Sequence, residues 1–334
     1  MRVAINGFGR IGKLVFRAFL EKKIKGVDVV AINELGSLES SYHLLQFDST
    51  HGQLPINISK TKDGLKYNNK KVLFYSEKDP VNLPWKKLKV DIVLECSGVF
   101  TSKEKSSAHI AAGAKKVIIS APGTNVDATV VHGVNQNIIN KKHNIISNAS
   151  CTTNCLAPVA MVLDQTVGIQ NGFMTTIHSF TGDQRTVDQT HGDLRRARTA
   201  SSSLIPSTTG AAKALSLVLP KLKGKLDGTA IRVPTPNVSL IDFTFVSKKK
   251  TSILAINNGM IKASKTSKLK NILTTNNLPL VSIDFNHNSS SSVFDLTQTQ
   301  VINEKFCRVL SWYDNEWGFS NRMIDTMLNL KKFI

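Results

Sequence analysis

The sequence has few cysteines and acidic residues, and it lacks long apolar runs. Its four cysteines, Cys96, Cys151, Cys155 and Cys307, are too few for a disulfide framework in 334 residues. Cys151 and Cys155 lie four residues apart, but no second Cys/His pair at zinc-finger spacing accompanies them, so we expect no metal. No apolar stretch approaches the roughly 20 residues of a membrane span, and the N-terminus does not resemble a secretory signal. We therefore expect a soluble, cytoplasmic protein with no membrane partner.

Positive charge is in excess, with 43 Lys and Arg against 24 Asp and Glu and a formal net charge of +19. Three interpretations are open: nucleic-acid binding, an active site for small anions, and compositional drift toward lysine. The lysines are scattered and no aromatic-rich RNA-binding motif is visible. We favour drift first and anion chemistry second, and we consider a nucleic-acid partner unlikely.

Residues 1–150 alternate short Val- and Ile-rich runs with a helical pattern from about Arg10 to Glu21. The apolar runs carry few charges, as strands buried on both faces should. This alternation predicts βαβ units and a Rossmann-type, doubly wound parallel sheet. The expected strands are Arg2–Asn6, Val27–Asn33, Val90–Cys96, Lys116–Ser120 and His143–Ser147.

Residues 151–314 have a different pattern and predict a second, α+β catalytic domain. A helical run from Cys151 to about Val167 precedes longer strand patterns, which indicate a mostly antiparallel sheet. A polar segment, Thr181–Ser203, is long enough to be functional. The expected strands are Phe173–Phe180, Thr229–Val233, Ser239–Ser247 and Phe306–Tyr313, and residues 315–334 should form a C-terminal helix.

A G-x-G-x-x-G motif is formed by Gly7, Gly9 and Gly12. It follows a strand pattern and opens a helix, which is the context of a dinucleotide site: the glycines let the backbone approach a pyrophosphate at the helix N-terminus. Glu34, 22 residues after Gly12, ends the next strand and could accept hydrogen bonds from a ribose. The alternative is a tight structural turn with an unrelated surface glutamate.

Cys151 follows a strand pattern and begins a helix, where the positive end of the helix dipole favours a thiolate. His178 lies on the next strand pattern, and a Cys–His pair is a common activated sulfur nucleophile. From spacing alone, a buried inert cysteine and a core histidine would be the better interpretation. Cys155, Cys96 and Cys307 are expected to be structural or core residues.

Six blocks change that assessment, because together and in order they resemble the phosphorylating glyceraldehyde-3-phosphate dehydrogenases over essentially the whole chain. They are INGFGRIG (5–12), FDSTHG (47–52), SNASCTTNCLAP (147–158), TTGAAKA (208–214), RVPTPNVS (232–239) and SWYDNEWG (311–318). The resemblance implies reversible oxidative phosphorylation of D-glyceraldehyde 3-phosphate to 1,3-bisphosphoglycerate, in glycolysis or gluconeogenesis, through a Cys151 thioester. It also implies NAD as cofactor, a homotetramer and a C-terminal helix packed on residues 1–150.

The resemblance further assigns roles to individual residues. Cys151 is expected as nucleophile and His178 as base. The substrate-phosphate site corresponds to Thr181 and Arg232, the inorganic-phosphate site to Ser150, Thr152, Thr209 and Gly210, and an arginine shared by both anions to Arg196. The cofactor-binding set comprises Asn6, Gly7, Gly9, Arg10, Ile11, Gly12, Glu34, Lys78, Phe100, Ser120 and Asn315.

Two alternatives to this assignment stay open. One is erythrose-4-phosphate dehydrogenase, which would use the same Cys and His, although the intact phosphate loop Ser207–Gly210 favours the phosphorylating enzyme. The other is a family member with an added nucleic-acid-binding role.

The residues expected near the adenosine ribose give opposing indications of the choice between NAD and NADP. The carboxylate of Glu34 disfavours NADP, whereas its length could let it swing away, and the polar Gln189 and Thr190 tolerate a phosphate. We expect NAD to be preferred, with measurable use of NADP.

Overall fold

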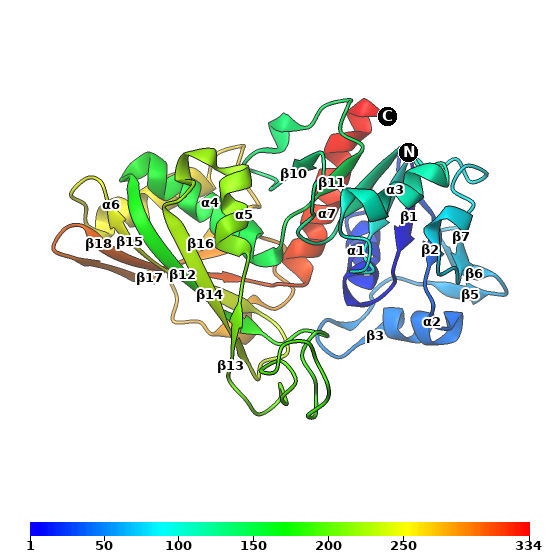
Figure 1. The fold of residues 1–334 in the computed structure, drawn as a ribbon, viewed down its shortest axis with the longest axis horizontal. Helices are drawn as coiled ribbons and strands as arrows, with labels where there is room; N and C mark the ends of the chain where they lie inside the picture. The colour runs from blue at the N-terminus through cyan, green and yellow to red at the C-terminus, as the bar shows by residue number, and fades with distance from the viewer. The chain divides into compact units, whose positions relative to one another are not determined.

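The computed structural model describes all 334 residues, 1–334, as two compact units. The first comprises Met1–Val130, Gln136–Ala149 and Ser320–Ile334, and the second comprises Val131–Asn135 and Ser150–Phe319. The helices are α1 (Arg10–Glu21), α2 (Leu38–Gln46), α3 (Lys103–Ala111), α4 (Cys151–Thr166), α5 (Ala211–Val218), α6 (Ile253–Ser264) and α7 (Trp317–Leu330) (Figure 1). Short 3₁₀ turns occupy Pro80–Asn82, Gln136–Ile138, Pro220–Leu222, Ser282–Phe285 and Lys331–Phe333. None of the helices combines the length and apolar composition of a membrane span.

The first unit is built on a nine-stranded sheet with β1 and β2 near its middle. In spatial order it contains β10 (Ala128–Thr129), β11 (Ile145–Ser147), β9 (Lys116–Ile119), β8 (Ile92–Glu95), β1 (Arg2–Asn6), β2 (Asp28–Asn33), β7 (Lys70–Tyr75), β6 (Gly64–Tyr67) and β5 (Ser59–Thr61). The pairings from β10 to β7 are parallel, and the β5–β6–β7 edge is antiparallel. A separate two-stranded ribbon pairs β3 (Phe47–Asp48) with β4 (Gly52–Gln53). The predicted parallel sheet is therefore present, and the antiparallel edge was not foreseen.

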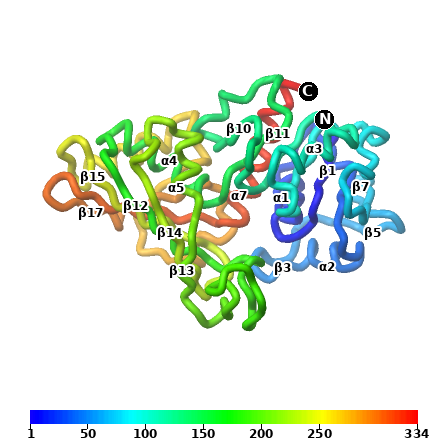
Figure 2. The backbone as a smooth tube through the Cα atoms, viewed as in Figure 1, coloured from blue at the N-terminus to red at the C-terminus, as the bar shows by residue number.

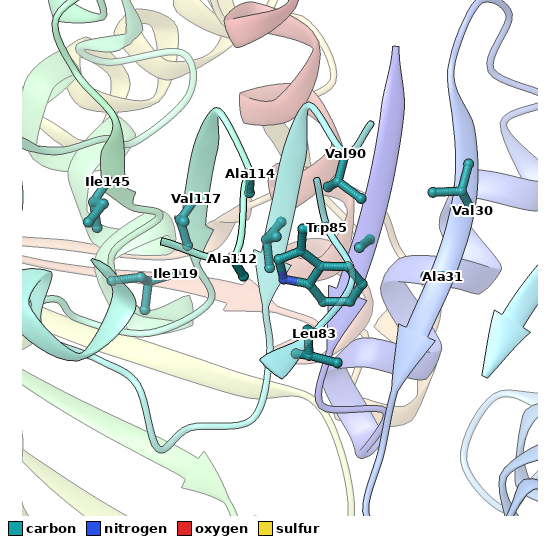
Figure 3. Packing of buried hydrophobic residues seen from close by; sticks show 12 residues of the cluster. Val30, Ala31, Leu83, Trp85, Val90, Ala112, Ala114, Val117, Ile119 and Ile145 are labelled. Atoms are coloured by element: carbon teal, nitrogen blue, oxygen red, sulfur yellow. The ribbon is translucent and has the colours of Figure 1, made fainter. Parts of the chain in front are cut away.

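Burial explains why the central strands have apolar sequences. All four residues of β8 and of β9 are buried, because helices and loops cover both faces of the sheet. Figure 3 shows side chains from β2, β9 and β11 packed with the indole of Trp85, which is inaccessible to solvent. Burying each such Val or Ile contributes about 1.5–3 kcal/mol, so this cluster fixes the sheet that carries the glycine-rich loop.

The C-terminal residues Ser320–Ile334 are part of the first unit. Within it, the Thr326 hydroxyl donates to Asn148 Oδ1 at 2.7 Å, and Asp325 lies 3.4 Å from Lys22 Nζ. Met323, Met327 and Leu330 are buried, as their helical spacing suggests.

The second unit is built on a seven-stranded sheet. In spatial order it contains β13 (Ile205–Thr208), β14 (Leu226–Val233), β12 (Ile169–Ser179), β15 (Ser239–Ser247), β18 (Phe306–Tyr313), β17 (Ser292–Ile302) and β16 (Leu273–Asn276). Four of its six pairings are antiparallel, and β12–β14 and β16–β17 are parallel. Helices α4, α5 and α6 lie along one face of this sheet (Figure 1). The predicted mostly antiparallel sheet is confirmed.

Between β12 and β13 the chain forms no helix or strand over residues 180–204, as the green tube in Figure 2 shows. This segment is held together by backbone hydrogen bonds, such as Gln189 N–H to the Ala197 carbonyl at 2.9 Å, and by side chains. Arg196 contacts Asp183 at 2.8 Å and the hydroxyl of Ser207 at 2.8 Å, and Arg198 contacts Asp188 at 2.7 Å. The long polar segment predicted over Thr181–Ser203 is thus an ordered loop.

Candidate active site

The strand β12 and the helix α4 bring Cys151 and His178 together in the second unit. Cys151 is the first residue of α4, and Ser150 caps this helix by accepting a hydrogen bond from the Thr153 N–H at 3.0 Å. His178 is the penultimate residue of β12 and is 3% exposed. Its Nε2 lies 3.4 Å from Cys151 Sγ, which is within hydrogen-bond distance for sulfur and nitrogen. The two residues predicted as nucleophile and base are therefore neighbours.

The other nitrogen of His178 decides which ring nitrogen can act as a base. Nδ1 lies 2.7 Å from the carbonyl oxygen of Ser179, which can only accept a hydrogen bond. This contact favours a proton on Nδ1 and leaves a lone pair on Nε2, facing Cys151. Arg232 Nη1 donates to the same Ser179 carbonyl at 3.2 Å. It also lies 2.8 Å from Nδ1, but with Nδ1 protonated this contact joins two donors and is not a hydrogen bond.

Burial governs the charge of both members of this pair. It raises the pKa of the Cys151 thiol, and the nearby Arg232 guanidinium and hydrogen bonds from Thr152 oppose that rise. For His178, burial and then Arg232 lower the pKa to about 3. The helix N-terminus alone predicted a thiolate; the buried site instead favours a neutral thiol beside a neutral imidazole, because both charged forms lose solvation.

Positive and hydrogen-bonding groups surround this pair. Arg232 keeps its Nε buried without a protein partner, which is unusual for a guanidinium. Thr152 Oγ1 contacts the hydroxyl of Tyr313 at 2.9 Å, and Thr181 donates through its N–H to Gln184 Oε1 at 2.9 Å. Arg196 donates one N–H each to Asp183, the Ser207 hydroxyl and the Thr208 carbonyl, which uses three of its five N–H groups.

A second helix N-terminus is formed by α5, which Gly210 precedes. Gly210 has no side chain with which to cap this end, and a Cβ at that position would meet no atom within 4 Å. The neighbouring Thr209 hydroxyl accepts a hydrogen bond from the Ala211 N–H at 3.2 Å. The open N–H groups here form an anion-binding arrangement.

The first unit contains a cleft of about 380 Å³ at the carboxyl ends of its central strands. This is where open α/β sheets bind dinucleotides, since β2 and β8 lie on opposite sides of β1 and the strand order reverses there. Of the predicted set, Asn6, Gly7, Gly9, Glu34, Lys78 and Phe100 line the cleft. Arg10, Ile11, Gly12 and Ser120 do not line it, and Asn315 lies in the second unit.

Sequence reasoning missed six residues that line this cleft: Asn33, Leu35, Glu77, Cys96, Ser97 and Val99. Cys96 was expected in the core, but it directly follows β8 and faces the cleft, and burial raises the pKa of its thiol. The position of residues 96–99 immediately after a central strand was the signal that could have identified them.

The glycines of the motif make the close approaches that the fingerprint requires. Gly7 has φ +85°, and a Cβ there would overlap the backbone of Ser97; a Cβ on Gly12 would overlap the Gly7 carbonyl. A Cβ on Gly9 would meet nothing within 4 Å, and no side chain caps α1 at that residue. The first turn of α1 is thus open to an anion.

Glu34 is fixed by the glycine-rich loop. Its Oε2 accepts the Phe8 N–H at 2.7 Å and its Oε1 accepts the Gly36 N–H at 3.1 Å. The sequence left open whether this longer side chain swings away, and these two contacts hold the carboxylate at the cleft.

A buried hydrogen-bond network forms the floor of the cleft. Asn6 Nδ2 donates to Glu95 Oε2 at 2.6 Å, and Asn33 Nδ2 donates to Asn6 Oδ1 at 2.7 Å. The indole N–H of Trp85 donates to His109 Nδ1 at 3.1 Å, so the ring proton of His109 lies on Nε2, 2.9 Å from Glu95. Both ends of the Asn6 side chain are therefore engaged within the protein. No group of three or more His, Cys, Asp or Glu is arranged to hold a metal.

Comparisons with known proteins agree with this geometry. Residues 1–103 match the family described as "Glyceraldehyde 3-phosphate dehydrogenase, NAD binding domain", and residues 150–315 match "Glyceraldehyde 3-phosphate dehydrogenase, C-terminal domain". The chain is 55% identical over 332 residues to the glyceraldehyde-3-phosphate dehydrogenase of Xanthobacter flavus, covering 99% of each chain. It is 54% identical over 333 residues to the enzyme of Zymomonas mobilis subsp. mobilis, again covering 99% of each chain. It is 52% identical to that of Geobacillus stearothermophilus over 326 residues, or 97% of this chain and 96% of its relative. The chain belongs to the glyceraldehyde-3-phosphate dehydrogenase family.

Proposed function

We propose that the chain catalyses the NAD-dependent oxidative phosphorylation of D-glyceraldehyde 3-phosphate to 1,3-bisphosphoglycerate, the reversible reaction of glycolysis and gluconeogenesis. The observation that carries this is the Cys151 Sγ to His178 Nε2 contact of 3.4 Å beside the guanidinium of Arg232. A thiol with a base supplies the chemistry for attack on an aldehyde, and a guanidinium supplies the charge for a phosphate. The curated relatives above, all named glyceraldehyde-3-phosphate dehydrogenase, support the same reaction.

Three features of the first unit are suited to binding NAD. The open backbone at Gly9, the uncapped N-terminus of α1 and the anchored carboxylate of Glu34 suit a pyrophosphate and a ribose hydroxyl. We assign Asn6 and the motif glycines to the floor of that site, and Lys78 and Phe100 to its rim. When bound, NAD supplies the acceptor for the hydride of the substrate.

The proton transfers fall to His178. As Cys151 Sγ bonds to the aldehyde carbon, Nε2 takes the thiol proton and returns it to the carbonyl oxygen, which gives a hemithioacetal. As this intermediate is oxidised to a thioester, Nε2 takes the hydroxyl proton. The Cys151 N–H at the start of α4 is suited to stabilise the oxyanion. A base with its pKa lowered to about 3 is neutral at pH 7 and can therefore accept both protons.

Inorganic phosphate completes the reaction by attacking the thioester carbon. The carbon–sulfur bond breaks, the protonated His178 returns its proton to Sγ, and the proton of the phosphate is released to solvent. The free thiol and the neutral base are then restored.

Two anion sites serve these phosphates. We assign the phosphate of the aldehyde to Thr181 and Arg232, whose buried Nε lacks a protein partner. We assign inorganic phosphate to Ser150, Thr152, Thr209 and Gly210, which lie at the N-termini of α4 and α5. Arg196 keeps two N–H groups beyond its contacts with Asp183, Ser207 and Thr208, and we assign them to an anion.

The organisation of the chain is part of the proposal. We assign NAD binding to residues 1–150 together with the helix within 315–334, and catalysis to residues 151–314. We also propose a cytoplasmic homotetramer, in which the Thr181–Ser203 loop contacts a neighbouring subunit. Light scattering at micromolar concentration should give a mass near four chains, and a fully active monomer would contradict the assembly.

The reaction is tested by measuring aldehyde-dependent NADH formation with and without inorganic phosphate. Glyceraldehyde 3-phosphate should be oxidised with multiple turnovers only when phosphate is present, and erythrose 4-phosphate should be a poorer substrate. His178→Asn should lower kcat by roughly 10²–10⁴-fold, the usual contribution of a positioned acid–base group. His43→Asn, at an exposed histidine of α2, is the matched control. An unchanged kcat in His178→Asn would remove this residue from the chemistry.

A further inference from the structure

Three polar side chains of the second unit meet where two strands and a helix end or begin. Ser179 ends β12, Ser239 begins β15, and Asn315 lies two residues before α7. Their exposed fractions are 0%, 1% and 4%, so solvent reaches little of their polar surface. The hydroxyl groups must therefore find their partners within the cluster.

Both serine hydroxyls contact the same oxygen. Ser179 Oγ donates to Asn315 Oδ1 at 2.7 Å and Ser239 Oγ donates to it at 2.9 Å. Ser239 Oγ also accepts the Ser179 N–H at 3.0 Å, and the two hydroxyl oxygens lie 3.2 Å apart. The two donors fill the two lone pairs of the amide oxygen.

The opposite orientation of the Asn315 amide would satisfy fewer hydrogen-bonding groups. If Nδ2 faced the serines, both hydroxyl oxygens could accept from it, but the two hydroxyl protons would then need acceptors. The only acceptor left among these side chains is the other hydroxyl, so only one of the protons could be used. The serines therefore hold Oδ1 inward and Nδ2 outward, and Nδ2 has no hydrogen-bond partner within the chain.

The backbone around this cluster is also fixed. The Asp314 carboxylate accepts the N–H groups of Glu316 at 2.9 Å and Trp317 at 2.7 Å, which anchors the start of α7. Val238, directly before Ser239, has φ +68°, a left-handed conformation that β-branched residues rarely adopt. It is 3% exposed and packs with Phe285 and Val293. Strain of this kind persists where the surrounding packing holds it, often beside functional groups.

Ser179 also connects this cluster to the catalytic base through a different atom. Its carbonyl oxygen accepts from His178 Nδ1 at 2.7 Å, while its hydroxyl contacts Asn315. One residue thus orients the base through its main chain and the amide through its side chain, and the two functions can be separated by mutation.

We propose that Ser179 and Ser239 are positioning residues that lock Asn315 with Nδ2 outward, so that the enzyme selects cofactors with a hydrogen-bond acceptor on the pyridine ring. This inference rests on the proposed function and on the resemblance, which places Asn315 in the cofactor-binding set; we assign its amide to the nicotinamide carboxamide. The acceptor is then the carboxamide oxygen, and the amide of Asn315 is oriented before the cofactor arrives. Such pre-organisation reduces the ordering that accompanies binding.

The first test is a double-mutant cycle on the full-length enzyme. Ser179→Ala should raise the KM for NAD by about three- to tenfold, as expected for one neutral hydrogen bond, with kcat changed less than the KM. In an Asn315→Ala background the same substitution should leave the KM unchanged, because the hydroxyl acts only through Asn315. The pH dependence of kcat should not move, because the Ser179 carbonyl remains.

Ser247→Ala is the matched control for this cycle. Ser247 is fully buried at the opposite end of β15, about 26 Å along the strand, and its hydroxyl donates to the Lys249 carbonyl at 2.7 Å. An equal increase in KM in both backgrounds, or none in the wild-type background, would overturn the positioning role.

The second test addresses the orientation directly and keeps both serines. It compares NAD with 3-acetylpyridine adenine dinucleotide, whose ketone can accept a hydrogen bond but cannot donate one. Asn315→Asp places an oxygen outward; NAD can turn its carboxamide to donate to it, but the analogue cannot. The ratio of kcat/KM for NAD to that for the analogue should rise about tenfold above the wild-type ratio, equivalent to about 1.4 kcal/mol.

The outcomes of the two tests separate the inference from the proposed function. An unchanged ratio in Asn315→Asp would mean that the wild-type amide presents its oxygen, and the inference would be wrong. An absence of aldehyde-dependent NAD reduction in the wild-type enzyme would instead refute the proposed function itself.

Discussion

Arg232 contacts both the base and the space that we assign to the substrate phosphate, so Arg232→Leu tests the site most directly. Its Nη1 lies 2.8 Å from His178 Nδ1, and its buried Nε has no protein partner. Loss of a charge-assisted hydrogen bond to a phosphate should weaken the transition state by roughly 1.5–3 kcal/mol. This corresponds to a loss of roughly 10- to 150-fold in kcat/KM.

The assay compares glyceraldehyde 3-phosphate with unphosphorylated glyceraldehyde. The ratio of their kcat/KM values should fall by that factor in Arg232→Leu, while the KM for NAD changes little. Arg308→Leu is the matched control, because Arg308 is a guanidinium of the same sheet that pairs with Asp242 at 2.8 Å. Equal losses for the two aldehydes would show that Arg232 does not bind the phosphate.

The same substitution has a second consequence, whose sign follows from charge. Arg232 opposes the burial that raises the pKa of Cys151, and it adds to the burial that lowers the pKa of His178. Removing the positive charge should therefore raise both pKa values. Alkylation of Cys151 by iodoacetamide, followed against pH, should shift its midpoint upward. A midpoint that moves downward or not at all would contradict the electrostatic role.

Three further predictions concern the thiols and the cofactor site. Iodoacetamide should label Cys151 first, because burial raises the pKa of Cys155 to about 12; peptide mapping that finds another thiol first would contradict the assignment. Gly7→Ala should abolish NAD binding and lower the thermal midpoint because of its φ of +85°, whereas Gly9→Ala should keep the midpoint and weaken NAD binding; calorimetry and cofactor titration check both. Glu34→Ala should shift the NAD-to-NADP ratio of kcat/KM toward NADP by about tenfold, as relief of roughly 1.4 kcal/mol of repulsion implies, and an unmoved ratio would remove Glu34 from the ribose site.

Strongly periodic elements could be predicted from the sequence. The strand Arg2–Asn6, the helix Arg10–Glu21 and the strand Ser239–Ser247 begin and end as expected. Each has a clear physical signal: a continuous apolar run, a glycine-rich start, or strict alternation of buried and partly exposed side chains. The expected second strand, Val27–Asn33, begins one residue later in the structure.

Elements with polar or mixed faces could not be predicted in this way. The long strand β17, Ser292–Ile302, begins in a serine run and carries Asp295 and the four consecutive polar residues 297–300, which hide its pairing with β18. The helix α3, Lys103–Ala111, has little apolar asymmetry because it buries a serine and a histidine. Tertiary contacts stabilise both elements, and these are not visible in local sequence.

Site residues, too, could be predicted only where the local sequence is distinctive. Cys151, His178 and Arg232 could be placed by resemblance, because each stands in a distinctive block of sequence. The amide orientation of Asn315 could not, because it depends on two serines that are 136 and 76 residues away along the chain. Hydrogen-bond direction is a property of the assembled site, and no single block of sequence contains it.

The helix dipole and burial act on the protonation of Cys151 in opposite directions. The start of α4 favours a Cys151 thiolate, and this dipole effect acts within the first turn. Burial acts on the same atom with the opposite sign, and it also disfavours the imidazolium that would accompany a thiolate. A neutral pair 3.4 Å apart leaves the proton transfer to the moment at which an aldehyde carbon is available to bond with sulfur. The substrate, by bringing its own phosphate to Arg232, would weaken the influence of that charge on both groups and so raise the pKa of the His178 imidazole and of the Cys151 thiol together. In the proposed mechanism, binding of the substrate phosphate and the protonation of the Cys–His pair are therefore coupled through one guanidinium.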